Sequence, residues 1–255
     1  MNSRFLLVVA IVAVAAVPLN AQTAVPGLCP TGYGAYSGGC GVLLSPGKPD
    51  GNYTYSFTYD STPESGSGVL LSDLLQATAG ANPESWYTSA DANWISTADS
   101  INPMAFAGVP DKVDSNVTVN FAMNFNLTGF DLSTVVISGA WTADDVGLGL
   151  ILNGVSLAGN SPGQGGALPE TDDSGNPPDL PWSTIYSFSL SSSTPGVSFN
   201  AGENTLVFSV DQADNYYDGL FVGSLSGTGS LLTPEPGSVL LIVTGLGMLA
   251  LRRRA

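Results

Sequence analysis

The chain has 255 residues and carries six basic against twenty-one acidic side chains, which gives a net charge of −15, and it contains no histidine. The lack of histidine excludes a Ser-His-Asp or Cys-His nucleophile, a histidine general base and a histidine-ligated zinc. The negative charge disfavours binding to nucleic acid or to anionic membrane surfaces, because both need basic patches.

The N-terminus is typical of a secretory signal peptide. Arg4 is the only charge before an apolar run over residues 5–17, and small residues supply a cleavage site after Ala21, with Ala24 as the alternative. We therefore expect residues 1–21 to form a signal helix that directs export.

Cys29 and Cys40 are the only cysteines, and a glycine-rich stretch separates them. An even pair with this spacing in an exported protein favours a structural disulfide, because a redox motif has its cysteines closer together. We predict that this disulfide ties an N-terminal extension over residues 22–50. In the chain-entropy model it stabilises the fold by about 2.5–3 kcal/mol.

Period-two alternation marks most of the remaining chain as β-structure. The clearest case is residues 117–127, where apolar side chains share one face and mainly asparagine and threonine the other. Further strands are expected at residues 53–59, 135–141, 148–152, 183–190, 205–210 and 220–225, with Asn153-Gly154 as a hairpin turn. Only residues 72–79 suggest a short helix. The pattern predicts one all-β domain over residues 51–230.

Two acidic stretches suggest other roles. Asp144 and Asp145 fall in an expected turn over residues 143–147, which is typical of a solvated carboxylate pair. A long surface loop is expected over residues 159–181, and its acidic part is flexible enough to wrap calcium but lacks the spacing of an EF-hand.

Residues 22–233 hold two basic and twenty acidic side chains, a net charge of about −18. We predict no cofactor, leave a structural calcium open and assign no metal ligands.

The C-terminal tail combines a Pro-Glu-Pro triplet, an uncharged apolar run and an arginine cluster. These are Pro234, Glu235, Pro236, residues 237–251, Arg252, Arg253 and Arg254. At ~1.5 Å rise per residue the run reaches only ~22 Å against a hydrocarbon core of ~30 Å, so it is a short transmembrane helix. The arginines extend it by snorkelling to the headgroups, and they mark the cytoplasmic side.

The order, spacing and terminal position of these features resemble the PEP-CTERM sorting signal. The resemblance implies that residues 233–255 are recognised and removed by an exosortase-type membrane protease, in bacteria that export such proteins with exopolysaccharide. It also implies an inner-membrane intermediate, followed by delivery to the cell surface or the extracellular matrix. The alternative is an ordinary C-terminal membrane anchor.

A second set of motifs lies between Trp86 and Gly229. It includes Asn93-Trp94-Ile95, Gly129-Phe130-Asp131-Leu132, Trp141-x-Ala143-Asp144-Asp145 and Gly202-Glu203-Asn204-Thr205-Leu206. Their order resembles the galactose-binding-like jelly-roll that many carbohydrate-binding modules share. The resemblance implies a single jelly-roll β-sandwich and a sugar-binding role.

Sugar binding requires aromatic faces for the pyranose rings and amide or carboxyl groups for the hydroxyls. One polar loop offers both kinds of group, and a tryptophan at a strand start adds another ring. The candidate ligand residues are Asp214, Asn215, Tyr216, Tyr217 and Trp182. The alternative is that these rings cap the sandwich. Trp94 and Trp141 lie inside apolar patterns and are expected in the core.

These observations predict an exported, non-catalytic envelope or matrix protein that binds or organises extracellular polysaccharide. A structural or adhesive surface protein without a sugar site is the alternative. A polysaccharide-degrading enzyme is the third reading, because glycoside hydrolysis needs only two carboxylates at a set separation. The expected partners are an exosortase-type protease, a polysaccharide and, before processing, the membrane.

Overall fold

The computed structural model describes residues 22–36, 39–44, 48–59, 62–70, 86–97, 117–144, 146–169, 181–212 and 219–232. Within these ranges the chain is all-β, as predicted, with thirteen strands, three short 3-10 helices and no α-helix. The described residues contain no helix that is long and apolar enough to cross a membrane. The signal segment, the helix expected at residues 72–79 and the C-terminal tail lie outside the described residues.

The elements follow one another in chain order. The strands are β1 (Gln22–Ala24), β2 (Tyr33–Tyr36), β3 (Gly39–Leu43), β4 (Pro49–Tyr59), β5 (Thr62–Leu70), β6 (Ile95–Ser96), β7 (Val117–Asn126), β8 (Val136–Asp144), β9 (Val146–Leu152), β10 (Val155–Ser156), β11 (Tyr186–Ser191), β12 (Glu203–Gln212) and β13 (Gly219–Ser230). The 3-10 helices are η3 (Leu132–Thr134), η4 (Pro162–Gln164) and η5 (Pro181–Ser183).

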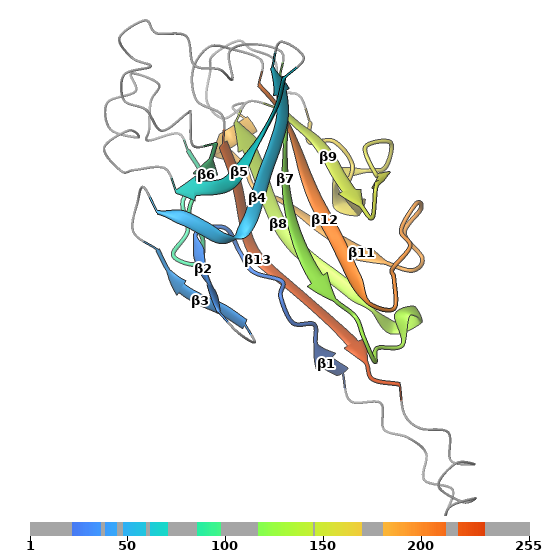
Figure 1. Ribbon diagram of the computed structural model, residues 1–255. Helices are drawn as coiled ribbons and strands as arrows, with labels where there is room; N and C mark the ends of the chain where they lie inside the picture. The colour runs from blue at the N-terminus through green and yellow to red at the C-terminus, as the bar shows by residue number, and fades with distance from the viewer. Residues whose placement is uncertain are drawn as a thin grey trace, which may run out of the picture.

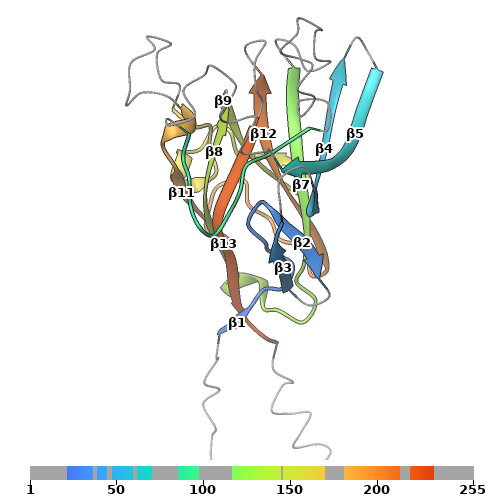
Figure 2. The same cartoon turned by 90° about the vertical axis from the view of Figure 1, so that its left-hand side faces the viewer.

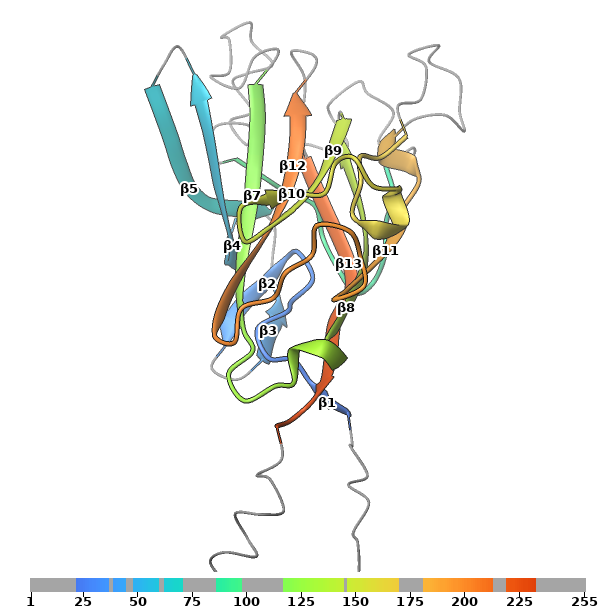
Figure 3. The ribbon, with the colours of Figure 1, turned by 90° about the vertical axis from the view of Figure 1, so that its right-hand side faces the viewer.

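All strands except the β2–β3 hairpin belong to one hydrogen-bonded sheet, in the order β10-β9-β12-β7-β4-β5-β6-β13-β8-β11, with β1 beside β13. The sheet turns back on itself through β5 and β6. Strands β9, β12, β7 and β4 therefore form one layer, and β13, β8 and β11 form the other (Figures 2 and 3). This gives the described part of the chain a β-sandwich-like architecture.

Aromatic side chains fill the space between the layers. The ring of Phe208 on β12 lies 5.5 Å from that of Trp141 on β8 and 6.1 Å from that of Phe188 on β11, between ring centroids. Trp141 and Trp94 are both buried, which confirms their prediction as core residues. The burial of β7 alternates along its whole length, so the pattern at residues 117–127 also predicted the correct inner face.

The turn predicted over residues 143–147 is wrong. Strand β8 continues to Asp144, which pairs with Gly219 of β13, and β9 starts at Val146 in the other layer. Strands β8 and β9 therefore lie in opposite layers, although only one residue separates them in the sequence. Asp144 is 6% exposed, so it is not the solvated carboxylate that the sequence suggested.

The loop expected over residues 159–181 is only partly a surface loop. Leu168 is 3% exposed and belongs to the main core. The backbone N–H of Leu168 donates to the Gly147 carbonyl, and that of Leu150 donates to the Gly165 carbonyl, each at 2.8 Å. This segment thus covers the free edge of β9, which would otherwise expose unpaired backbone groups. Residues 170–180, with the proposed calcium-wrapping stretch, lie outside the described residues.

The segment over residues 22–50 joins the sandwich directly. Strand β1 pairs with the end of β13, so that Gln22 lies opposite Ser230, and Val25 and Leu28 enter the main core. Strand β4 already begins at Pro49. Figure 1 shows β1 and the end of β13 together at one pole of the molecule. We call this end the terminal pole.

Candidate functional site

The predicted ligand residues Asp214, Asn215, Tyr216 and Tyr217 lie outside the described residues. Trp182 is described, and it occupies η5 with its ring half-buried. It packs with Trp86, Tyr87 and Ile185 against a second core cluster of Ala92, Trp94 and Phe221.

This second cluster lies on the outer face of β13. Phe221 alternates with Leu220 and Val222, which belong to the main core, so its ring points away from that core. The rings of Trp86 and Trp94 lie 4.5 Å apart between centroids, and the Trp94 indole N–H donates to the Tyr87 carbonyl at 2.8 Å. The cluster is therefore a packed aromatic layer that holds the segment over residues 86–97 against the sheet.

A different site emerges on the outer face of the other layer, where β4 and β7 meet. The two strands pair through only three residue pairs, Thr54 with Ala122, Tyr55 with Phe121 and Ser56 with Asn120. Toward the terminal pole the strands part, and a groove of about 500 Å³ opens there. We call it the proximal groove. Its volume lies within the usual range of ligand sites.

Small and polar residues from five segments line the proximal groove. They are Pro26, Gly27, Gly39, Gly51, Asn52, Thr54, Ala122, Asn124, Phe125, Asn126 and Glu203. Gly27 has a φ of +87°, and a Cβ there would meet the Asn124 carbonyl oxygen at 3.3 Å. Glycine therefore lets the N-terminal segment approach β7 closely enough to form one wall.

Internal hydrogen bonds orient the amides of the proximal groove. The Asn124 Oδ1 accepts from the Thr205 hydroxyl at 2.8 Å, and the Asn126 Oδ1 accepts from the Thr128 N–H at 2.7 Å. Both asparagines therefore keep their amide NH₂ groups as donors. Asn52 is oriented the opposite way, because its Nδ2 donates to the Tyr33 carbonyl at 2.8 Å. With the Glu203 carboxylate, the groove presents donors and acceptors together, which is what hydroxyl groups require.

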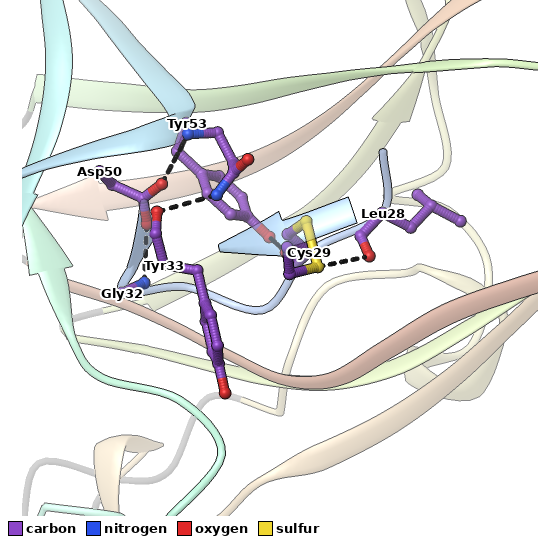
Figure 4. The surroundings of a disulfide bond; sticks show 8 residues. Leu28, Cys29, Gly32, Tyr33, Asp50 and Tyr53 are labelled. Carbon is purple, nitrogen blue, oxygen red and sulfur yellow. Dashed lines mark hydrogen bonds between the residues drawn. A yellow bond between two sulfur atoms is a disulfide. The ribbon is translucent and has the colours of Figure 1, made fainter. Parts of the chain in front are cut away.

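The glycine-rich rim of this groove is cross-linked. The predicted disulfide is confirmed, with the Cα atoms of Cys29 and Cys40 5.3 Å apart. The buried Asp50 carboxylate accepts the N–H of Gly32 at 2.7 Å, and those of Asn52 and Tyr53 at 2.7 and 3.3 Å (Figure 4). The disulfide and Asp50 together fix the β2–β3 hairpin against the start of β4.

Burial shifts the pKa values of two side chains in this rim, Asp50 and Tyr53. Burial raises the pKa of Asp50 above its ordinary value, although the backbone hydrogen bonds to the Asp50 carboxylate act in the opposite direction. Burial also raises the pKa of the Tyr53 hydroxyl, with a further contribution from the nearby Asp50 charge. The Tyr53 hydroxyl donates to the Cys29 carbonyl at 2.8 Å and stays neutral at physiological pH.

Neither a metal site nor a carboxylate pair is evident here. The described ranges contain no group of three or more cysteine, histidine, aspartate or glutamate residues placed to hold a metal ion. Glu203 is the only carboxylate among the residues that line the proximal groove.

Sequence reasoning missed the proximal groove. The pattern at residues 117–127 predicts a face of mainly asparagine and threonine side chains, but it assigns no ligand residue to that face. Trp182 lies on the outer face of the opposite layer, so the structure does not bring it to this groove.

Comparison with known proteins gives no match to this chain among family models, curated proteins or solved structures.

Proposed function

We propose that this protein is an exported, non-catalytic component of the cell envelope or extracellular matrix. A PEP-CTERM tail sorts it, and a jelly-roll sandwich binds or organises extracellular polysaccharide. The observation that carries the binding role is the proximal groove, where the Asn124 and Asn126 amides face the groove beside Asn52 and Glu203. Amides and carboxylates of this kind form hydrogen bonds with sugar hydroxyls.

Two features support the proposed sorting by the tail and the proposed jelly-roll fold. The tail over residues 233–255 begins just after Leu232, which follows β13 at the terminal pole, so a membrane helix there would hold the whole sandwich by one end. Successive strands β8 and β9 lie in opposite antiparallel layers, which agrees with a jelly-roll path.

The sorting role is tested by processing in a bacterium that has an exosortase-type protease. We expect the full-length chain to lose its tail, with the mass of the surface or secreted form ending near residue 233. A variant with Pro234→Ala, Glu235→Ala and Pro236→Ala should accumulate in the membrane with its tail intact. Equal processing of both chains would contradict the proposal.

The binding role is tested by affinity electrophoresis of the full-length chain, in a detergent without a sugar headgroup, through gels that contain single polysaccharides. Asn124→Ala with Asn126→Ala should weaken retardation about tenfold or more, since each lost hydrogen bond contributes about 1 kcal/mol. Ser187→Ala with Ser189→Ala, on the exposed face of β11, is the matched control and should leave retardation unchanged. If no polysaccharide retards the chain, the binding role is wrong.

A structural or adhesive role without a sugar site is the second candidate. The burial of Trp94 and Trp141 favours it, because rings in the core cannot stack on sugars. Among the residues that line the proximal groove, Phe125 is the only aromatic residue, and its side chain faces the core. If the variant with Asn124→Ala and Asn126→Ala were retarded by a polymer as strongly as the wild-type chain, that result would support a structural or adhesive role.

A further inference from the structure

A second groove lies on the same two strands, on the other side of their short pairing. Beyond the Ser56–Asn120 pair, β4 and β7 part again, and a groove of about 590 Å³ opens toward the pole opposite the termini. We call it the distal groove. Ser56, Thr58, Ser65, Thr118 and Asn120 supply its polar lining.

The distal groove contains an unsatisfied polar atom. The Oδ1 of Asn120 is buried and has no hydrogen-bond partner among the described residues. Such an atom costs about 1–3 kcal/mol, and a donor that reaches it removes this cost. The neighbouring hydroxyls of Ser56 and Thr118 are chemically suited to the same ligand.

The two grooves are neighbours along β4 and β7, and we call the outer surface at Ala122, between them, the Ala122 saddle. Thr54 and Ala122 line the proximal groove, and the next outward residues on the same strands, Ser56 and Asn120, line the distal groove. The Ala122 side chain is a single methyl group, so it projects little from the strand between them. At ~3.3 Å per residue, Asn120 and Asn124 stand ~13 Å apart along β7, which is too far for one monosaccharide but suits a chain.

Charge restricts what can occupy this path. Among the described residues that line either groove, Glu203 is the only ionisable one. These described lining residues include no cation that could pair with a uronate or sulfate group, and residues 22–233 carry a net charge of about −18. An anionic polymer would be repelled.

We propose that the two grooves are subsites for one linear, uncharged polysaccharide chain that lies along the outer face of β7 and crosses the Ala122 saddle. This inference rests on the proposed polysaccharide-binding function and adds the ligand class and its path. It assigns Asn120 to a subsite of its own, about four residues along β7 from the proximal amides.

The test uses the full-length chain in the same detergent. Affinity electrophoresis first compares neutral polymers (dextran, a linear β-1,3-glucan, hydroxyethyl cellulose and galactomannan) with alginate and hyaluronan, with and without calcium. Calorimetric titration then compares the disaccharide and the hexasaccharide of the neutral polymer that retards the chain most.

We expect a neutral polymer to bind the chain. We also expect the hexasaccharide of that polymer to bind at least tenfold more tightly than the disaccharide. Asn120→Ala and Asn124→Ala should each weaken hexasaccharide binding about fivefold or more. Ala122→Trp should abolish the advantage of the hexasaccharide while disaccharide binding survives. Ser189→Trp, on the exposed face of β11, is the bulky control, and near-UV circular dichroism checks that every variant is folded.

The other outcomes separate the two proposals. Binding that is independent of chain length, unaffected by Asn120→Ala or limited to alginate or hyaluronan would overturn the two-groove path and leave polysaccharide binding standing. Retardation by none of the polymers would overturn both.

Discussion

At the scale of single residues, Asp50 shows how a buried charge can organise a surface. Its carboxylate accepts three backbone N–H groups from two separate segments, Gly32 on one side and Asn52 and Tyr53 on the other. Nothing in the composition of residues 49–52 suggests a buried aspartate, since Pro-Asp-Gly-Asn is typical of an exposed turn. The partner that explains it, Gly32, is eighteen residues away.

Asp50→Asn should lower the free energy of unfolding at pH 7 by about 1–3 kcal/mol, because the amide keeps one acceptor oxygen and turns its NH₂ group toward a backbone donor. Burial raises the pKa of Asp50 in the folded protein above its pKa in the unfolded chain. The contribution of Asp50 to the free energy of unfolding is therefore complete below the unfolded pKa, and it declines as the pH rises through the folded pKa. The difference between wild type and variant should therefore grow on acidification. Urea unfolding of both chains at pH 7 and at about pH 4 measures this, and a difference that shrinks at low pH would contradict it.

At the scale of elements, the two layers are joined by one cluster of rings around β12. Phe208 is fully buried and approaches rings on three other strands, those of Tyr53, Trp141 and Phe188. The sequence predicted a strand over residues 205–210. It did not predict which rings meet there, because β4, β8 and β11 reach the core from distant parts of the chain.

Phe208→Ala should lower the free energy of unfolding by about 3–5 kcal/mol, through lost burial and the cavity that remains. Val207→Ala, at the next residue on the outer face of the same strand, is the matched control and should cost less than about 1 kcal/mol. Urea unfolding followed by tryptophan fluorescence measures both. Similar losses for the two variants would mean that β12 does not link the layers in this way.

At the scale of the whole molecule, both ends of the described chain leave the sandwich at the terminal pole (Figure 1). Strand β13 is complete at Ser230, and its last residues are needed by β1, since Thr228 pairs with Ala24. The proposed sorting tail, from residue 233 on, can thus be removed without loss of any residue of β1 or β13. A cut a few residues earlier would break the β1 pairing and expose Val25, which packs over Gly227.

Residues 22–232, expressed without the tail, should therefore unfold in a single cooperative transition. Residues 22–226 should unfold at a markedly lower temperature or fail to fold. Differential scanning calorimetry of the two fragments makes the comparison. Equal transition temperatures would show that β1 and the end of β13 contribute little.

The sequence by itself determined seven of the strands (β4, β7, β8, β9, β11, β12 and β13), the inner face of β7 and the disulfide. These depend on local information, because side chains alternate across a strand and the chain has only two cysteines, which can pair only with each other. Only the tertiary structure decided where the grooves lie. They exist because β4 and β7 pair over three residues and then part on both sides, a register set between residues more than sixty positions apart. No local pattern encodes the place where two such strands separate, so the polar face of residues 117–127 could be predicted but the site upon it could not.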